Sequence, residues 1–271
     1  MLGSASVLSL FLVFAGALSF RWGVLPFGAS FSIFGLALLA CALLSMVAGA
    51  LIFRRLARKQ GLEKMSLWLF LCLLPVVVVV NQVGVSGFQA PAIHDISTDL
   101  LHPPVFVLAQ VERGPGDNTL AHGGEALAEQ QRLAYPQLEP LHLSASLADV
   151  WAAALAVVGD NNWRVLGADK KQGRIEAVAT TRLMGFSDDI VIRIKPEAPS
   201  LTMTSGGAPV SAEGGDKNKP LAVAGVIVDV RSLSRVGVSD LGANAARIDS
   251  FLTALQRRLN NALFLEAPLN K

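Results

Sequence analysis

Residues 29–53 read ASFSIFGLALLACALLSMVAGALIF and contain no charged side chain. A helix needs about 20 apolar residues to cross the hydrocarbon core of a bilayer, so this stretch is long enough to span a membrane. Similar apolar stretches lie on either side of it, over residues 2–20 and 65–85. No basic residue precedes the first one, which argues against a cleavable signal peptide. The sequence therefore predicts a membrane domain of three transmembrane helices over residues 1–85.

The composition of the whole chain supports this interpretation. Of the 271 residues, 52% are hydrophobic and 16% are charged, whereas about 25% are charged in an ordinary soluble domain. The 23 basic and 21 acidic side chains give a net charge of +2. That charge is small and dispersed, so the chain does not have the basic footprint of a nucleic-acid-binding protein.

The connections between the apolar stretches differ in charge. The first connection carries Arg21 alone, whereas the second is strongly basic, with Arg54, Arg55, Arg58, Lys59 and Lys64. Basic loops stay on the cytoplasmic side of a membrane. We therefore expect a multi-pass protein of the bacterial inner membrane with a cytoplasmic N-terminus. Everything after residue 85 would then lie in the periplasm.

The exported part differs in chemistry from the membrane domain. Residues 1–85 hold six basic side chains and one acidic, which leaves 17 basic and 20 acidic in the remainder. Any anion site there must therefore be local. Both cysteines, Cys41 and Cys72, fall within the predicted spans, which leaves no cysteine nucleophile or zinc-thiolate site outside them. We expect no metal and no cofactor.

Residues 86–271 show a change in pattern at about residue 140. Residues 86–140 contain several Pro and Gly residues and predict an extended strap and a surface loop, with a short helix over 125–133. Residues 141–271 predict a compact core. Ser146 and Asp149 resemble a capping box that opens an amphipathic helix. Alternating apolar residues predict strands over 163–166, 174–181, 189–194 and 226–230, and the loop over 196–224 leaves room for a short strand at 201–204.

The last helix is predicted by one apolar stripe with steps of three and four residues, formed by Leu241, Ala245, Ile248, Leu252, Leu255, Leu259 and Ala262. Such a stripe either covers the sheet of its own domain, which we favour, or pairs with a partner helix. The order of elements predicts an α+β fold after the three transmembrane helices. Its exported part would be a two-layer domain with an antiparallel sheet covered by helices.

Three phrases concentrate ionisable residues next to turns. They are IHDISTD over residues 93–99, GFSDD over 185–189, and RSLSRVGVSDLGANAAR over 231–247. In these phrases the sequence resembles a bacterial and plastid domain-of-unknown-function family, over about residues 91–259. The resemblance implies a shared fold and lends no reaction, cofactor or catalytic residue. The chain departs from the family pattern mainly in the length of the loop over 196–224.

The third phrase has two interpretations. In the structural one, which we favour, Ser239 or Asp240 caps the last helix and the arginines hold a strand-to-helix corner. Their expected partners are acidic, so that Arg231, Arg235 and Arg247 pair with Asp188, Asp189 and Asp229. In the functional one, the arginines converge with the first turn of the helix to bind a phosphate or carboxylate. The candidate ligand-binding residues are Arg231, Arg235, Asp240, Asn244, Arg247, Asp188 and Asp189.

Two catalytic or metal interpretations are weaker. A metal site formed by Asp188, Asp189, Asp240 and His94 is disfavoured because adjacent aspartates on a strand point to opposite faces. His94 and Asp95 could form an acid–base pair, but neighbours on an extended segment face apart. We therefore interpret them as anchors of the strap. No catalytic triad is evident.

These observations lead to a functional expectation of limited detail. We expect a binding or accessory module at the periplasmic face of the inner membrane that contacts membrane lipids. It would recognise an anionic group or another envelope protein through the corner from Arg231 to Arg247, and it would not bind nucleic acid. The alternatives are an envelope hydrolase with Asp188 or Asp189 as general base, and a structural subunit of a membrane complex.

Overall fold

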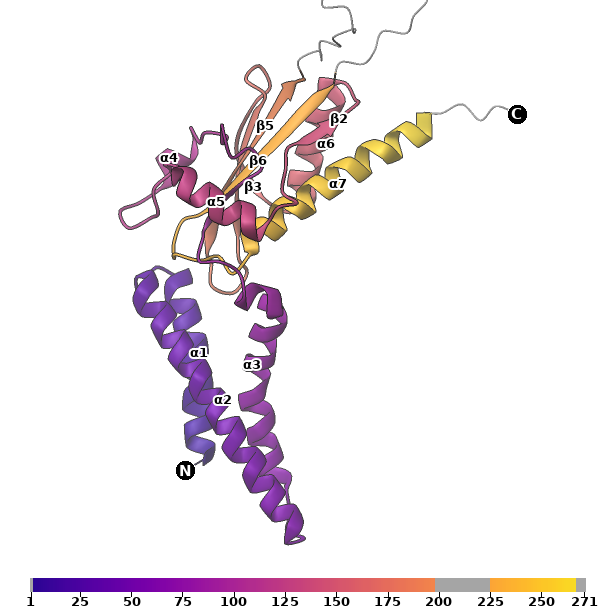
Figure 1. Ribbon diagram of the computed structural model, residues 1–271. Helices are drawn as coiled ribbons and strands as arrows, with labels where there is room; N and C mark the ends of the chain where they lie inside the picture. The colour runs from indigo at the N-terminus through magenta and orange to yellow at the C-terminus, as the bar shows by residue number, and fades with distance from the viewer. Residues whose placement is uncertain (1, 198–224, 267–271) are drawn as a thin grey trace, which may run out of the picture. The chain divides into compact units, whose positions relative to one another are not determined.

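The computed structural model describes residues 2–197 and 225–266 (Figure 1). By their contacts these residues divide into two compact units. The first comprises Met1–Ala92 together with two short loops, Thr180–Ser187 and Val236–Gly242. The second comprises the remaining described residues and holds the sheet. The strand over residues 201–204 that the sequence allowed lies outside the described residues.

The first unit contains three long apolar helices, as predicted. They are α1 (Leu2–Arg21), α2 (Phe27–Ala57) and α3 (Glu63–Phe88), and each is long and apolar enough to cross a membrane. The third helix ends later than expected. It kinks at Gly84, where φ is +68°, and continues to Phe88. Residues 86–88, which we expected in the strap, are therefore helical.

Helices α1 and α2 pack closely through small side chains. Gly16 lies so near α2 that a Cβ atom added to it would be 2.6 Å from the backbone nitrogen of Phe34. Ser6, Ala17, Ala37 and Cys41 are buried in the same unit. Small residues let helix backbones approach one another, which is how apolar helices associate without a hydrophobic driving force.

The second unit is built on a six-stranded sheet, so the fold is α+β as predicted. The main strand order is β1-β6-β5-β4-β3, and β2 pairs with the other half of β6. The pairs β1–β6, β2–β6, β3–β4 and β5–β6 are antiparallel. The strands are β1 (Asp95–Ser97), β2 (Leu141–Leu143), β3 (Arg164–Asp169), β4 (Arg174–Thr180), β5 (Ser187–Pro196) and β6 (Val226–Ser234).

Strands β1 and β2 were missed by the sequence analysis, which placed β1 in the strap of residues 86–140 and predicted no strand at the start of the compact core, where β2 lies. Each has only three residues, and three residues show no recognisable alternation. They exist because β6 offers a free edge. Asp95 to Ser97 pair with Leu233 to Arg231, and Leu141 to Leu143 pair with Val228 to Val226.

Four helices accompany the sheet. They are α4 (Ala109–Glu112), α5 (Gly124–Ala134), α6 (Leu147–Asp160) and α7 (Ala243–Glu266). The expected cap of α6 is confirmed, because the Ser146 hydroxyl accepts a 3.1 Å hydrogen bond from the backbone N–H of Asp149. This bond satisfies one of the N–H groups that a helix start leaves without a partner.

The two sides of β5 face different surroundings. Ile190, Ile192 and Ile194 are buried in one cluster with side chains of α6 and α7, which lie along the same side of the strands (Figure 1). Val191 points to the opposite face and packs with Phe106, Ala109 and Leu233. The strap, defined here as residues 93–122, therefore contributes to the second face of the sheet.

The apolar stripe of α7 is turned slightly from its expected position. Ile248, Phe251 and Leu255 are fully buried, whereas Leu252 is half-buried and Leu241 precedes the helix and is 41% exposed. Ala245, Ile248, Leu255 and Leu259 are buried as expected. Phe251 lies three residues after Ile248 and four before Leu255, so it shares their face of the helix. Phe251 takes the central place and stacks on Trp163 with ring centroids 5.7 Å apart.

Truncating this stripe tests whether α7 is part of the core. Leu255→Ala should lower the free energy of unfolding by about 2–5 kcal/mol, because it leaves a cavity at a fully buried leucine. The exposed neighbour Gln256→Ala is the matched control and should change it by less than about 0.5 kcal/mol. The measurement is urea-dependent proteolysis of the full chain. Equal midpoints for the two variants would mean that the stripe does not pack on the sheet.

Candidate functional site

The strap is joined to the sheet by a buried ion pair between Arg231 on β6 and Asp95 on β1. Both side chains are about 97% buried. The guanidinium donates from Nε to Oδ1 and from Nη2 to Oδ2 of Asp95, each at 2.8 Å. Two parallel bonds of this kind are the strongest geometry available to an arginine and a carboxylate.

Arg231 also organises the rest of the strap. Its remaining N–H groups donate to the carbonyl oxygens of Pro104 at 3.2 Å and Leu120 at 2.9 Å. The ring of Phe106 lies against the guanidinium, with its centroid 5.0 Å away. One side chain of the sheet thus holds four points of a strap that has little regular structure of its own.

A second buried pairing centres on Asp189 of β5, which is fully buried. Arg235 donates to both of its oxygens, at 2.7 Å from Nη2 to Oδ1 and 3.1 Å from Nε to Oδ2. Arg113 of the strap donates to Oδ2 at 2.8 Å. The pairing extends outward, since Arg235 also bonds Glu112. The bond from Arg164, together with the contribution of Arg235, lowers the pKa of Glu112 to about 2.

Asp188 faces the other side of the sheet, as alternation along a strand requires. It accepts a 2.5 Å hydrogen bond from Arg247 of α7. Beside this pair, Asn244 accepts from the Ser232 hydroxyl at 2.6 Å and donates to the carbonyl oxygen of His94 at 3.0 Å. His94 is therefore held through its backbone, whereas Asp95 is held through its side chain.

Asp229 does not have the partner that the sequence analysis expected. We expected Asp229 to pair with an arginine of the third phrase, but it contacts Arg193 at 2.7 Å and Lys195 at 3.2 Å. Arg193 also reaches Asp99 of the strap at 2.9 Å. Burial raises the pKa of Asp99, but the backbone N–H of His102 and the Arg193 guanidinium outweigh it, so the net shift is downward.

Asp240 is the remaining candidate residue of the third phrase. It belongs with Ser239 to the loop Val236–Gly242 of the first unit. Its carboxylate accepts a 2.8 Å bond from the backbone N–H of Gly242, and the Ser239 hydroxyl accepts one of 3.2 Å from that of Leu241. Both bonds are local turns that precede α7. Among the described residues, no group of three or more His, Cys, Asp or Glu side chains is placed to hold a metal ion.

Two residues that the sequence analysis overlooked fix the strap further. Glu176 of β4 is 1% exposed and accepts from the backbone N–H groups of Val107, Leu108 and Ala109 at 2.8–3.1 Å. Gln131 of α5 bonds both the N–H and the carbonyl oxygen of Ser97, at 2.9 and 2.6 Å. Glu176 could have been identified from the sequence, because it is a charged residue within an otherwise apolar predicted strand. No feature of the sequence singled out Gln131.

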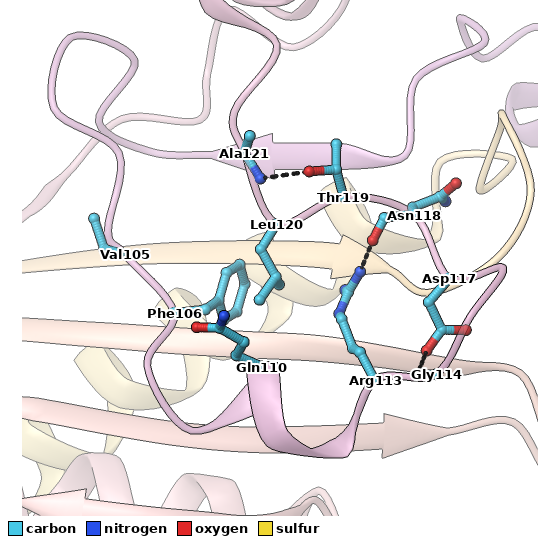
Figure 2. Close-up of a pocket in the computed structure, with 10 residues that line it drawn as sticks. All are labelled: Val105, Phe106, Gln110, Arg113, Gly114, Asp117, Asn118, Thr119, Leu120 and Ala121. Atoms are coloured by element: carbon cyan, nitrogen blue, oxygen red, sulfur yellow. Dashed lines mark hydrogen bonds between the residues drawn. The ribbon is translucent and has the colours of Figure 1, made fainter.

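Residues 105–121 of the strap line an open hollow of about 450 Å³ (Figure 2). Phe106 and Leu120 supply apolar walls, and Arg113 bonds the carbonyl oxygen of Asn118 across one side. Asp117 accepts a 3.0 Å bond from the backbone N–H of Gly114. The hydrogen bonds drawn in Figure 2 connect residues that line the hollow to one another. The hollow therefore lies on a segment whose backbone is held in place by hydrogen bonds.

Removing one partner of the buried pair tests its structural role. Arg231→Met should lower the free energy of unfolding by about 3–5 kcal/mol, since it leaves Asp95 buried and unpaired. The double variant Arg231→Met with Asp95→Leu should recover most of that loss, because no charge remains buried. Arg258→Met is the control, since its pair with Asp160 is exposed and should be worth at most about 1 kcal/mol. A loss at Arg231 no larger than at Arg258, in unfolding of the full chain, would contradict this role.

The comparison with known proteins agrees with the resemblance seen in the three phrases. The chain matches the family model described as "Protein of unknown function (DUF1499)" over residues 95–207 and 216–255, which is more than half of its length. No curated protein compared with the chain matches it. The matched residues include Arg231, Asp95, Asp189 and Arg235, which carry the buried pairings. The chain therefore belongs to the DUF1499 family of proteins of unknown function.

Proposed function

We propose that this protein is a membrane-anchored, non-enzymatic binding module of the bacterial envelope whose strap docks another envelope protein. The observation that carries the proposal is an apolar surface on the strap. Five aliphatic side chains of the strap are exposed, and we call them the strap surface: Leu101 (78%), Val105 (70%), Val107 (46%), Leu108 (38%) and Val111 (86%).

The strap surface is presented on a braced backbone. The N–H groups of Val107 and Leu108 are bonded to the buried carboxylate of Glu176, and the carbonyl oxygen of Pro104 accepts a bond from Arg231. Exposed apolar patches on protein surfaces mark sites of protein–protein interaction. A rigid surface also loses less conformational entropy when a partner binds, which favours affinity.

The hollow adds a feature that protein interfaces use. Val105 belongs both to the strap surface and to the wall of the hollow. Interface residues that contribute most to binding fill such pockets and are surrounded by polar groups. In this protein the surrounding polar side chains include Gln110, Asp117 and Thr119. We infer that the partner inserts an apolar side chain here.

The ion pairs within the charged phrases favour a binding function over a catalytic one. Asp188 is bonded to Arg247 through Oδ2, and both oxygens of Asp189 are engaged by arginines. A general base needs a free oxygen that can reach a substrate proton, and Asp189 has none. Recognition of an anion through Arg231 and Arg235 would likewise have to displace carboxylates that are already in place. The docking of a partner at the strap surface requires neither change.

The membrane arrangement belongs to the same proposal. We propose that α1, α2 and α3 span the inner membrane with the N-terminus in the cytoplasm and the sheet in the periplasm. The proposal is supported by the basic residues between α2 and α3 and by Arg54 and Arg55 in the last turn of α2. The connection between α1 and α2, residues 22–26, holds no basic residue, and Arg21 before it is the last residue of α1.

Reporter fusions test the orientation. A reporter that works only in the periplasm should be active after Lys271 and inactive when inserted at Lys59, and a cytoplasmic reporter should show the reverse. The reason is that the positive-inside rule assigns the basic connection to the cytoplasm. Cytoplasmic activity after Lys271 would contradict the orientation.

Site-specific photo-crosslinking in native membranes tests the docking surface. A crosslinking residue at Val105 or Val111 should give one discrete adduct with an envelope protein. One at Leu133, which is 76% exposed on α5, is the matched control and should not give it. Val111→Glu combined with the crosslinker at Val105 should reduce the adduct at least tenfold, because a charge would have to be desolvated. The same adduct from Leu133, or an adduct unaffected by Val111→Glu, would contradict the proposal.

A further inference from the structure

Two loops of the chain pack among the apolar helices although they are distant from them in sequence. The loop Thr180–Ser187 joins β4 to β5, and the loop Val236–Gly242 joins β6 to α7. Met184 of the first loop is 8% exposed and is buried in one cluster with Val13, Ala17 and Phe34. These loops contain the GFS and VGVSDLG portions of the charged phrases, which the ion pairs described above do not use.

Aromatic rings fix the first loop to the ends of α1 and α2. Phe186 lies 5.2 Å from Phe20 and 5.6 Å from Phe27, measured between ring centroids. Arg21, the last residue of α1, donates to the carbonyl oxygens of Thr181 at 3.3 Å and Arg182 at 2.6 Å. The loop is therefore seated at the level where the apolar helices end.

Two glycines show how closely the loops approach these helix ends. Gly185 has φ of +73°, and a Cβ added to it would lie 3.2 Å from Cγ of Arg21. Gly237 has φ of +87°, and its added Cβ would lie 3.4 Å from the ring of Phe27. Glycine is the residue that adopts positive φ without strain. Residues 20–27 of the α1–α2 connection and the two loops thus form one continuous surface.

That surface exposes apolar side chains and cations together. The exposed apolar residues are Trp22 (69%), Val24 (68%), Leu183 (43%), Val238 (75%) and Leu241 (41%). Arg21 and Arg182 lie among them, and Asp240 is the one acidic residue in the two loops. Exposed aromatic and aliphatic residues mixed with arginine are typical of the boundary between a bilayer and water.

We propose that the loops Thr180–Ser187 and Val236–Gly242 bind the phospholipid surface of the bilayer that α1–α3 span, with Leu183 and Val238 inserted among the headgroups. This proposal rests on the proposed membrane anchoring. Lipid is the occupant because the surface is continuous with the ends of the apolar helices, where lipid is the adjoining solvent. The family phrases then have two uses, since their charged residues hold the strap and their glycines and apolar residues bind the membrane.

The experiment uses the full chain in nanodiscs of phosphatidylethanolamine and phosphatidylglycerol. Single variants Leu183→Cys and Val238→Cys carry an environment-sensitive fluorophore. The native Cys41 and Cys72 are buried, and labelling of the unmutated protein measures how much they contribute to the background. Both labels should be quenched at least threefold more by nitroxide-bearing lipid than by aqueous iodide. Val111→Cys, which is exposed to a similar degree as Val238, should show the opposite preference.

A fourth site separates failure of this inference from failure of the anchoring. Leu39→Cys lies on an exposed face in the middle of α2, and lipid nitroxide should quench its label if the helix spans the bilayer. Quenching at Leu39 with iodide-accessible labels at Leu183 and Val238 would overturn the loop proposal alone. Iodide access at Leu39 as well would overturn both proposals. Because Val238 is 75% exposed, its replacement removes no core contact.

Discussion

The buried pair of Arg231 and Asp95 is the interaction on which the arrangement of the second unit depends. Burying two charges is costly unless their geometry is good and their other hydrogen-bonding groups are satisfied. Here the guanidinium meets both conditions, with two bonds to Asp95 and further bonds to Pro104 and Leu120. Those partners come from three separate points of the strap. The strap can therefore adopt only a path that brings all three to β6.

Strand β6 has two roles in the second unit. Along its backbone it pairs with β5 on one edge and with β1 and β2 on the other. Across its faces it supplies Val228 and Val230 to the core and Arg231 and Asp229 to ion pairs. The polar phrases thus stabilise an irregular segment that local hydrogen bonding alone would not hold. That bracing is why the exposed aliphatic residues of the strap form a defined surface.

The two proposals assign different binding partners to two parts of the protein. The strap surface would face a protein partner, and the loops Thr180–Ser187 and Val236–Gly242 would face lipid. Both rest on exposed apolar side chains whose backbone is fixed by neighbouring contacts, through Glu176 and Arg231 in one case and through Phe186 and Arg21 in the other. Neither requires the charged side chains to leave their partners.

The sequence by itself determined the elements that depend on local pattern. Three apolar stretches, the capped α6, four of the strands and α7 could all be predicted, because span length, capping and periodicity are properties of neighbouring residues. Only the tertiary structure decided how the charges pair. Arg231 was expected to pair with one of Asp188, Asp189 and Asp229, of which Asp229 is two residues away, but it binds Asp95, which is 136 positions distant. Strand β1 and the backbone groups that Glu176 binds were missed for the same reason. Each depends on a partner that folding brings from elsewhere in the chain, and nothing in the local sequence encodes that distance.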